Sequence, residues 1–291
     1  MNTFDAALVF KTIIQQGSMV KAAEALHIHP SVISKKLVYL ENQLGLQLLK
    51  RTTRNIELTE AGHIFYERIT ALSNNWDASI EEVKDLNDHP KGTLRICSPQ
   101  PLSSRFIAPI LQDFQQQYPD IKFELIHASY EQLPHNNADI TICRKLENFN
   151  SSNFVGVPLH TYQNGLYASP AYLRNRPKIE SHQDLEKQNC IVYKSGKDKY
   201  IWQFDNQKKI EIQPSLIADN TEVIISSAVN HLGIAYIPAV ILPLELQQKT
   251  LVPVLPNYQS KIFETYIYYQ KMEFIPLKMR VFIDYLKKSF I

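Results

Sequence analysis

SMVKAAEALHIHPSVISKKLVYLENQLGLQLLKRTTR, residues 18–54, carries the strongest structural signal in this chain of 291 residues. Its pattern predicts two short helices, a tight bend between them, and a basic hairpin after them. Ala22 and Ala23 are small, so a second helix can approach the first closely. Pro30 predicts the start of the second helix, because its fixed φ suits a first helical turn, and Gly45 predicts its end.

The second helix has an apolar face and a polar face. The apolar series starts at Val32 or Ile33 and continues at helical spacing through Leu37, Leu40 and Leu44. The other face combines short hydroxyls with long cations, namely Ser31, Ser34, Lys35 and Lys36. A helix in a DNA major groove needs such a face, because cations bind phosphates and compact polar groups reach base edges. The alternative is that the lysine pair is only a solvated face.

This stretch resembles the winged helix-turn-helix of the LysR-type transcriptional regulators. The spacing is kept throughout the matching residues, which are Ala22, Ala23, Leu26, Ser34, Leu40, Glu41, Leu44, Gly45, Leu48, Arg51, Arg54, Leu58, Thr59, Glu60, Ala61 and Gly62. The chain departs from the family at three residues. His29 and Pro30 stand where the family usually has Ser or Thr followed by Gln, and Leu49 replaces a usual Phe.

We expect the DNA contacts to come from three places: the start of the first helix, the polar face of the second helix, and the wing. The candidate residues are Ser18, Ser31, Val32, Ser34, Lys35, Lys36, Arg51 and Arg54. Charge supports this placement, because residues 1–58 contain seven Lys and Arg against four Asp and Glu, whereas the whole chain has a net charge of only +2. Clustered cations attract phosphates better than scattered ones.

From Thr59 the apolar residues repeat every seven residues, which predicts one long helix that ends at Pro90–Gly92. The seam is interrupted by Ser79 and consists of Phe65, Ile69, Leu72, Trp76, Val83 and Leu86. Either this helix packs on its own domain, or it pairs with the same helix of a second chain. Pairing is the favoured interpretation, since it would place two recognition helices about one DNA turn apart.

Beyond Gly92 short apolar strands alternate with helices, which predicts parallel sheets covered by helices. Strands are expected at TLRIC, KFELIHA, ADITICR, NGLYAS, NCIVYK, LIADN, IAYIP and TYIYYQ, with helices near residues 104–118 and 277–290. The fold class is therefore α/β, with an N-terminal all-α part that carries the winged helix-turn-helix and the long linker helix.

This second part is similar to the effector-binding half of the same family. The pieces that carry the resemblance are LRICSPQPLSSRFIAPIL, FQQQYPDIKFEL, ADITICR, YASPAYL, DLEKQNCIVY, HLGIAYIP and MRVFIDYL. IWQF and LVPVLPNY resemble one large subgroup with varied or unassigned effectors, and Lys145 replaces a usual Gly. The resemblance implies a two-lobed domain like a periplasmic binding protein.

The expected domains are a DNA-binding domain at 1–58, a dimerisation helix at 59–91 and an effector domain at 92–291. The effector domain divides into lobe I at about 92–162 and 265–291, and lobe II at about 163–264. The resemblance further implies a homotetramer made of two dimers, operator DNA and a small effector as ligands, and RNA polymerase as a candidate partner.

The expected effector site follows the strand at residues 93–97. Hydroxyls and an amide gather there at a helix start, where free N–H groups favour an anion such as a carboxylate. Strand-end residues should face the same crevice, because ligands collect at the carboxyl ends of parallel strands. The candidates are Ser98, Gln100, Ser103, Ser104, Arg144, Asn220 and Thr221. Alternatively, Ser103 and Ser104 are helix caps and Arg144 pairs with an acid in its own lobe.

The rival hypothesis is an enzyme or solute-binding protein built on the C-terminal fold. The sequence has no GxSxG, no phosphate-binding glycine loop and no metal-ligand spacing, so we expect no enzyme, cofactor or metal site. Cys97, Cys143 and Cys190 have no CxxC spacing. A redox switch at Cys97 and Cys143 is a minor alternative to inert packing. The sequence has neither a secretion signal nor a membrane span, so a cytoplasmic location is expected, with no membrane partner.

Overall fold

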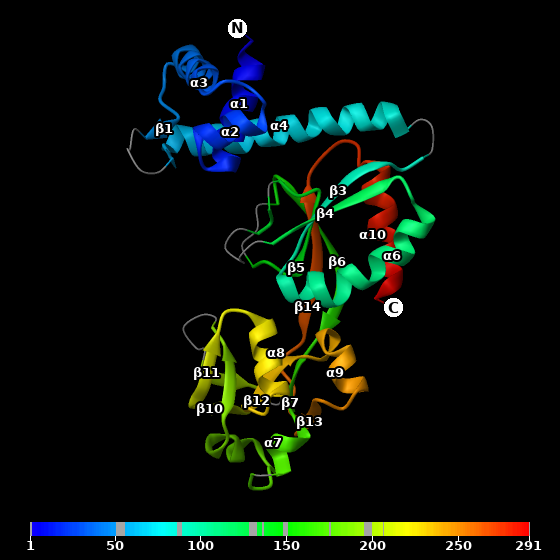
Figure 1. Ribbon diagram of the computed structural model, residues 1–291. Helices are drawn as coiled ribbons and strands as arrows, with labels where there is room; N and C mark the ends of the chain where they lie inside the picture. The colour runs from blue at the N-terminus through cyan, green and yellow to red at the C-terminus, as the bar shows by residue number, and fades with distance from the viewer. Residues whose placement is uncertain are drawn as a thin grey trace. The chain divides into compact units, whose positions relative to one another are not determined.

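The computed structural model describes residues 2–50, 56–85, 89–127, 133–135, 137–147, 151–174, 176–194, 200–205 and 207–290. The chain forms two compact units, which are Met1–His89 with Gln270–Leu277, and Pro90–Tyr269 with Lys278–Ile291 (Figure 1).

The first unit is mainly helical. Its elements are α1 (Thr3–Gln16), α2 (Met19–Ala25), α3 (Pro30–Leu44), β1 (Leu49–Lys50), β2 (Glu57–Leu58) and α4 (Glu60–Asp85). β1 and β2 form an antiparallel pair, which is the base of the wing. The expected helix pair and hairpin are confirmed. Pro30 begins α3, and Gly45 caps its end with a φ of 66°, a left-handed value that glycine adopts without strain.

The apolar core of the first unit is formed mainly by α1, α2 and α3, with Leu49 of β1 and Ile69 of α4. Ala22 and Ala23 are fully or nearly fully buried, as expected for a close approach of two helices. The apolar face of α3 contributes Ile33, Leu37 and Leu40, which are also buried. Leu44 is 38% exposed, so the apolar face of α3 does not extend to its last turn.

The start of α4 is tightly joined to the root of the wing. Glu41 Oε1 accepts hydrogen bonds from the Leu48 and Leu49 N–H groups at 2.7 and 3.3 Å. Thr59 Oγ1 donates to the Gln47 carbonyl at 2.7 Å, and the Thr59 N–H donates to Leu48 O at 3.0 Å. A Cβ on Gly62 would lie 2.1 Å from Leu48 O, so only glycine allows this approach.

The second unit contains two five-stranded sheets. The first has the order β4–β3–β5–β14–β6 and comprises β3 (Gly92–Cys97), β4 (Ile121–Ile126), β5 (Ile140–Arg144), β6 (Phe154–Tyr162) and β14 (Phe263–Gln270). We call this sheet and its helices the first lobe. Its helical elements are α5 (Gln100–Leu102), the π-helix η1 (Ser103–Ile107), α6 (Ala108–Gln117) and α10 (Leu277–Ser289).

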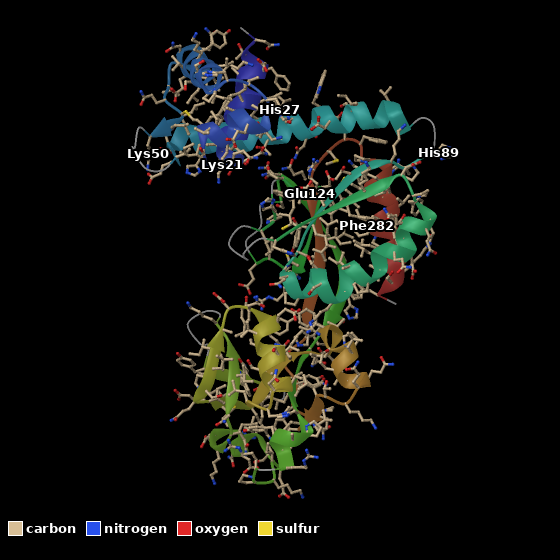
Figure 2. The ribbon with its side chains drawn as sticks, viewed as in Figure 1. Lys21, His27, Lys50, His89, Glu124 and Phe282 are labelled. Carbon is tan, nitrogen blue, oxygen red and sulfur yellow. The ribbon has the colours of Figure 1, made fainter. Side chains whose placement is uncertain are left out.

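Aromatic packing fixes α6 and α10 in the first lobe. Phe282 lies on α10, where Figure 2 labels it. Its ring lies 5.1 Å from that of Phe114 on α6, and the Phe114 ring lies 5.8 Å from that of Phe123 on β4. Phe114 and Phe282 are both fully buried. Edge-to-face packing of this kind stabilises more than burial of area alone.

The second sheet has the order β11–β8–β12–β7–β13 and, with its helices and a hairpin, forms the second lobe. Its strands are β7 (Asn164–Ala168), β8 (Cys190–Tyr193), β11 (Pro214–Ala218), β12 (Ile234–Pro238) and β13 (Val252–Val254). The hairpin pairs β9 (Ile201–Gln203) with β10 (Lys209–Glu211). The helical elements are α7 (Pro170–Arg174), η3 (His182–Lys187), α8 (Thr221–Val229), η4 (Ala239–Ile241) and α9 (Pro243–Gln247).

The two lobes are joined where β6 runs into β7 and where the chain returns from β13 to β14. Buried Ser260 ties these two segments together. The Asn164 N–H donates to Ser260 Oγ at 2.8 Å, and Gln163 Nε2 donates to the Ser260 carbonyl at 2.7 Å.

The expected strands and the two helices are present, but the sheets are mixed rather than parallel. β3 pairs in parallel with β4 and β5, whereas β14 runs antiparallel to β5, and β7 antiparallel to β12 and β13. The reason is that the chain enters the second lobe on β7 and returns to the first lobe on β14, so each of these strands enters its sheet from the opposite end. The strands β6, β9, β10 and β13 were not expected from the sequence.

Candidate DNA-binding surface and effector site

The exposed face of α3 carries most of the expected DNA-binding residues. Ser31, Ser34 and Lys35 are exposed, and Val32 is half-buried. Ser34 Oγ donates to the Pro30 carbonyl at 3.4 Å, so its hydroxyl stays close to the start of the helix. Within the described part of the chain, Lys35 has no ion-pair partner, and its ammonium is available to an external anion.

Lys36 has a different environment from its neighbour Lys35. Its Nζ donates to Asp5 Oδ2 of α1 at 2.5 Å, and its side chain is 18% exposed. One lysine of the pair therefore holds α3 against α1, while the other faces solvent. A lysine that is already paired with a carboxylate, as Lys36 is, contributes less to phosphate binding than a solvated lysine of the same reach.

His29 caps α3 in place of the usual Ser or Thr. The Ser31 N–H donates to His29 Nδ1 at 3.3 Å, and Ser31 Oγ lies 2.9 Å from the same nitrogen. His29 is the N-cap residue of α3. The imidazole thus satisfies one of the helix N–H groups that lack a partner within the helix.

The other expected DNA contacts lie at the ends of this region. Ser18 is the N-cap position of α2 and is half-buried, and it makes no side-chain capping bond. Lys50 and Glu57 form an ion pair of 3.2 Å across the base of the wing. The predicted wing residues Arg51 and Arg54 lie outside the described residues.

The apolar seam of α4 divides into two halves. The first half packs on its own unit: Ile69 is 4% exposed, and the ring of Phe65 lies 5.8 Å from that of Phe10. The second half faces solvent, with Leu72, Trp76 and Val83 exposed by 54%, 60% and 68%. The first half of α4 therefore fits the alternative that the helix packs on its own domain, and the exposed second half fits the alternative that it pairs with a second chain. Leu86, the last predicted member, lies outside the described residues.

Two of the expected effector residues are fully enclosed. Ser98 and Ser103 are 0% and 1% exposed, and their hydroxyls are hydrogen-bonded to each other. This pair joins the end of β3 to η1 inside the first lobe. Their hydroxyls are therefore satisfied within the protein. The capping alternative is wrong for Ser103, because its hydroxyl bonds to Ser98 and α5, η1 and α6 have no side-chain cap at their N-termini.

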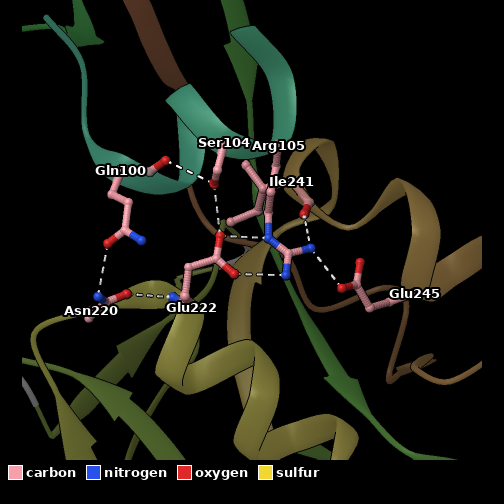
Figure 3. Close-up of polar contacts among 7 residues, drawn as sticks. All are labelled: Gln100, Ser104, Arg105, Asn220, Glu222, Ile241 and Glu245. Atoms are coloured by element: carbon pink, nitrogen blue, oxygen red, sulfur yellow. Dashed lines mark hydrogen bonds and ion pairs between the residues drawn. The ribbon is translucent and has the colours of Figure 1, made fainter. Parts of the chain in front are cut away.

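Three other expected residues meet across the two lobes (Figure 3). Asn220 Nδ2 at the start of α8 donates to Gln100 Oε1 of α5 at 3.0 Å. Ser104 Oγ of η1 donates to Glu222 Oε1 of α8 at 3.1 Å. The sequence thus identified both sides of a real junction, although it did not identify the charged residues at its centre.

Arg105 lies at the centre of this junction between the lobes, and the sequence did not identify it. Its Nε and Nη2 donate to Glu222 Oε1 and Oε2 at 2.7 and 2.8 Å, and its Nη1 donates to Glu245 Oε1 at 2.7 Å and to the Ile241 carbonyl at 3.2 Å. The hydrogen bond from Arg105 lowers the pKa of Glu222, and the same bond raises the pKa of Arg105. The only sequence signal was the position of Arg105 next to Ser104.

The remaining effector candidates are Arg144 and Thr221. Arg144 is exposed at the end of β5, and its guanidinium lies over the ring of Phe263, 5.2 Å from the centroid. Its neighbour Lys145 pairs with Glu264 at 2.7 Å within the first lobe. Thr221 is the first residue of α8 and is half-buried.

The cysteines are buried and protonated. Burial raises the pKa of Cys97 to about 11 and that of Cys143 to about 12. They lie on the adjacent strands β3 and β5, and both are free thiols. Thiols with such pKa values are poor nucleophiles at neutral pH, which favours inert packing over redox sensing.

In the residues that the structure describes, no group of three or more His, Cys, Asp or Glu is placed to hold a metal ion. No helix in that same part of the chain is both long and apolar enough to span a membrane.

Comparison with known families gives two matches that together cover most of the chain. A family model described as the LysR substrate binding domain matches residues 87–291. A second, described as the bacterial regulatory helix-turn-helix protein of the lysR family, matches residues 4–63.

Individual relatives and solved structures agree with these matches. The HTH-type transcriptional regulator PtxR of Pseudomonas aeruginosa is 26% identical over 283 residues, covering 96% of this chain and 90% of that protein. CrgA of Neisseria meningitidis is 27% identical over 283 residues, covering 96% and 94%. The structure of CrgA has a TM-score of 0.62 at 26% identity and covers 98% of both chains. The full-length structure of the Vibrio cholerae virulence activator AphB has a TM-score of 0.62 at 25% identity and covers 100% of both chains.

Proposed function

The chain belongs to the LysR family of bacterial transcriptional regulators, and on that premise we propose how its parts share the work. It is a DNA-binding regulator of transcription with a C-terminal effector-binding domain, and it is not an enzyme. The rival interpretation, an enzyme or solute-binding protein built on the C-terminal fold, is therefore wrong. The proposed domains are 1–58 for DNA binding, 59–91 for pairing, and 92–291 for effector binding.

The observation that carries the proposed DNA contacts is the exposed face of α3. Ser31, Ser34 and Lys35 project from one helix whose opposite face is buried in the core of the first unit. In helix-turn-helix proteins the second helix enters the major groove and its N-terminal residues reach base edges. We assign Ser31 and Ser34 to base edges or sugar, and Lys35 to a phosphate.

Fluorescence anisotropy with the DNA upstream of the chain's own gene tests this assignment. Wild-type protein should bind with an affinity that falls steeply as salt increases. Ser34→Ala should reduce discrimination between this DNA and a shuffled duplex, because a base-edge contact carries sequence information. Glu186→Ala, an exposed position in the second lobe, is the control and should bind as wild type does. If Ser34→Ala leaves the discrimination unchanged, this residue does not read the operator.

We propose that two chains pair along the second half of α4. Support comes from Leu72, Trp76 and Val83, which expose a row of large apolar side chains at coiled-coil spacing. An antiparallel or parallel pairing of this row would cover it and bring two α3 helices to one face of DNA. The homotetramer, RNA polymerase as a partner and a cytoplasmic location are further proposals, and they rest on the function of the family in transcription.

We propose that the effector binds where the two lobes of the second unit meet. Gln100, Ser104 and Asn220 support this place, because each already bonds across the junction. A ligand that alters this junction changes the relative free energy of two lobe arrangements, and it regulates by its different affinity for them. Titration calorimetry with a metabolite panel, followed by Ser104→Ala on any ligand found, tests the location. An unchanged affinity in Ser104→Ala and in Gln100→Ala would place the effector elsewhere.

A further inference from the structure

The junction between the lobes contains a complete carboxylate-binding arrangement. The fork formed by Arg105 Nε and Nη2 binds both oxygens of Glu222, at 2.7 and 2.8 Å (Figure 3). Ser104 Oγ donates a third hydrogen bond to the same carboxylate, at 3.1 Å. Arginine recognises free carboxylate ligands with the same two-pronged geometry, and a hydroxyl donor adds to its selectivity.

The carboxylate comes from the other lobe. Arg105 and Ser104 belong to η1 of the first lobe, whereas Glu222 lies in the first turn of α8 in the second lobe. Asn220 Oδ1 accepts from the Glu222 N–H at 2.8 Å, so the backbone that carries this carboxylate is itself fixed by the helix cap. Side-chain contacts at this point therefore connect the lobes in addition to the two chain crossings at Ser260.

The remaining donor of Arg105 is also used within the protein. Nη1 binds Glu245 Oε1 of α9 and the Ile241 carbonyl of η4, both in the second lobe. The side chains of Arg105, Glu222 and Glu245 are 19%, 27% and 13% exposed. Charges at this depth are less screened by salt than surface pairs, and removing one partner leaves the others poorly compensated.

We propose that Glu222 is a built-in ligand of an anion-binding site formed by Arg105 and Ser104. It holds the two lobes together in the unliganded protein, and a carboxylate effector reaches this site only by displacing it. The built-in ligand and its hold on the lobes concern the second unit alone. Displacement by an effector rests on the proposed function, and it names the chemical class of effector that this junction accepts.

The first test replaces the internal carboxylate by an external one. Glu222→Ala should lower the Tm of the protein by roughly 5 °C, because Arg105 loses its bidentate partner. Sodium acetate should restore roughly half of this loss, relative to sodium chloride at equal ionic strength. Wild type should respond equally to both salts, since its site is filled. The double variant Arg105→Ala/Glu222→Ala should show no acetate effect.

Two results of this test would overturn the proposal. One is a Glu222→Ala protein that is as stable as the control Glu264→Ala, which loses an exposed ion pair inside the first lobe. The other is a Glu222→Ala protein that acetate stabilises no more than chloride does. Either result shows that Arg105 and Ser104 do not form an anion site.

The second test keeps the shape of the side chain and measures the junction itself. In Glu222→Gln, hydrogen exchange of residues 100–107 and 220–229 should be at least ~10-fold faster than in wild type, because local opening is easier. Glu264→Gln should leave exchange of the same residues unchanged. Equal exchange in Glu222→Gln and wild type would contradict the role of Glu222 in holding the lobes, even if Glu222→Ala fails to fold.

These outcomes are separable from the proposed function. Tm, acetate rescue and hydrogen exchange need no DNA, so they report on the junction alone. If operator binding fails in wild type while acetate rescues Glu222→Ala, the proposed function is wrong and the built-in ligand remains. If wild type binds the operator but acetate does not rescue Glu222→Ala, the proposed function stands and the built-in ligand is wrong.

Discussion

The ammonium of Lys36 lies 2.5 Å from the carboxylate of Asp5, which places the second lysine of the α3 pair against α1. Lys35 next to it is exposed. Two adjacent lysines on the same helix thus have different roles, and substitutions should separate them.

Lys35→Ala should weaken operator binding and reduce the slope of log affinity against log salt by about one unit, since one phosphate contact is lost. Lys36→Ala should change this slope less and should lower the free energy of unfolding by about 0.5 kcal/mol, the size of a partly exposed ion pair. Anisotropy at four salt concentrations and urea denaturation measure both quantities. Equal slopes for the two variants would show that the Asp5 pair does not withdraw Lys36 from DNA.

The exposed row on α4 predicts a self-association defect. Leu72→Asp/Val83→Asp should shift the protein to a smaller oligomer in analytical ultracentrifugation, because two carboxylates would have to be buried at the paired surface. Each of these side chains is more than half exposed, so the chain itself should fold normally. Asp77→Lys changes charge at an exposed position outside the row and serves as control. An unchanged mass for the double variant argues that pairing uses another surface.

Gly62→Ala tests whether alanine at this position raises or lowers the free energy of unfolding. In an ordinary helix this change would add about 1 kcal/mol of stability, because alanine is the better helix former. Here the new Cβ would lie 2.1 Å from the Leu48 carbonyl oxygen, so we expect a net loss of roughly 2 kcal/mol or more. Urea denaturation of the wild type and the variant measures it. A more stable Gly62→Ala protein would mean that the root of the wing moves away without cost.

The thiols should be unreactive in the native protein. Burial raises the pKa of Cys97 to about 11, so at pH 8 on the order of one thiol in a thousand is ionised. Ellman's reagent should therefore label native protein at least ~100-fold more slowly than urea-unfolded protein, in which all three cysteines react. Rapid labelling of one native thiol at pH 8 would reopen the redox-switch hypothesis.

The junction should weaken in acid. Its hydrogen bonds from Arg105 hold the pKa of Glu222 below the ordinary value of 4.5. Stability from this shift is fully present above about pH 4.5 and disappears as the pH falls through the lowered pKa. Arg105 stays charged over this range, because Glu222 raises its pKa. The difference in Tm between wild type and Glu222→Gln should thus be constant from pH 8 to 5 and shrink below that, whereas a difference that does not vary with pH contradicts the assignment.

The features that the sequence predicted well are determined by neighbouring residues. Pro30 and Gly45 bound α3 through their own backbone preferences, and Ala22 and Ala23 reveal a close helix contact through their size. The strand pair β1–β2 and the strand that ends just before Ser98 follow equally local patterns. Such signals need no knowledge of the rest of the fold.

Long-range relationships explain what the sequence did not reveal. Arg105 is 117 residues from Glu222 and 140 from Glu245, so no periodicity connects them. The division of the α4 seam depends on which part of α4 packs against the core of its own unit, and the heptad pattern alone does not contain this. Gly156 and Pro158 interrupt the sequence of β6, and this hid a nine-residue strand.

The glycine at position 62 has a mechanical consequence. The backbone of α4 contacts the carbonyl of Leu48 there, and hydrogen bonds from Thr59 and to Glu41 hold the same segment. The start of the long helix and the root of the wing therefore form one rigid segment. A rotation of α4 about its own axis would therefore carry the paired strands β1 and β2 with it.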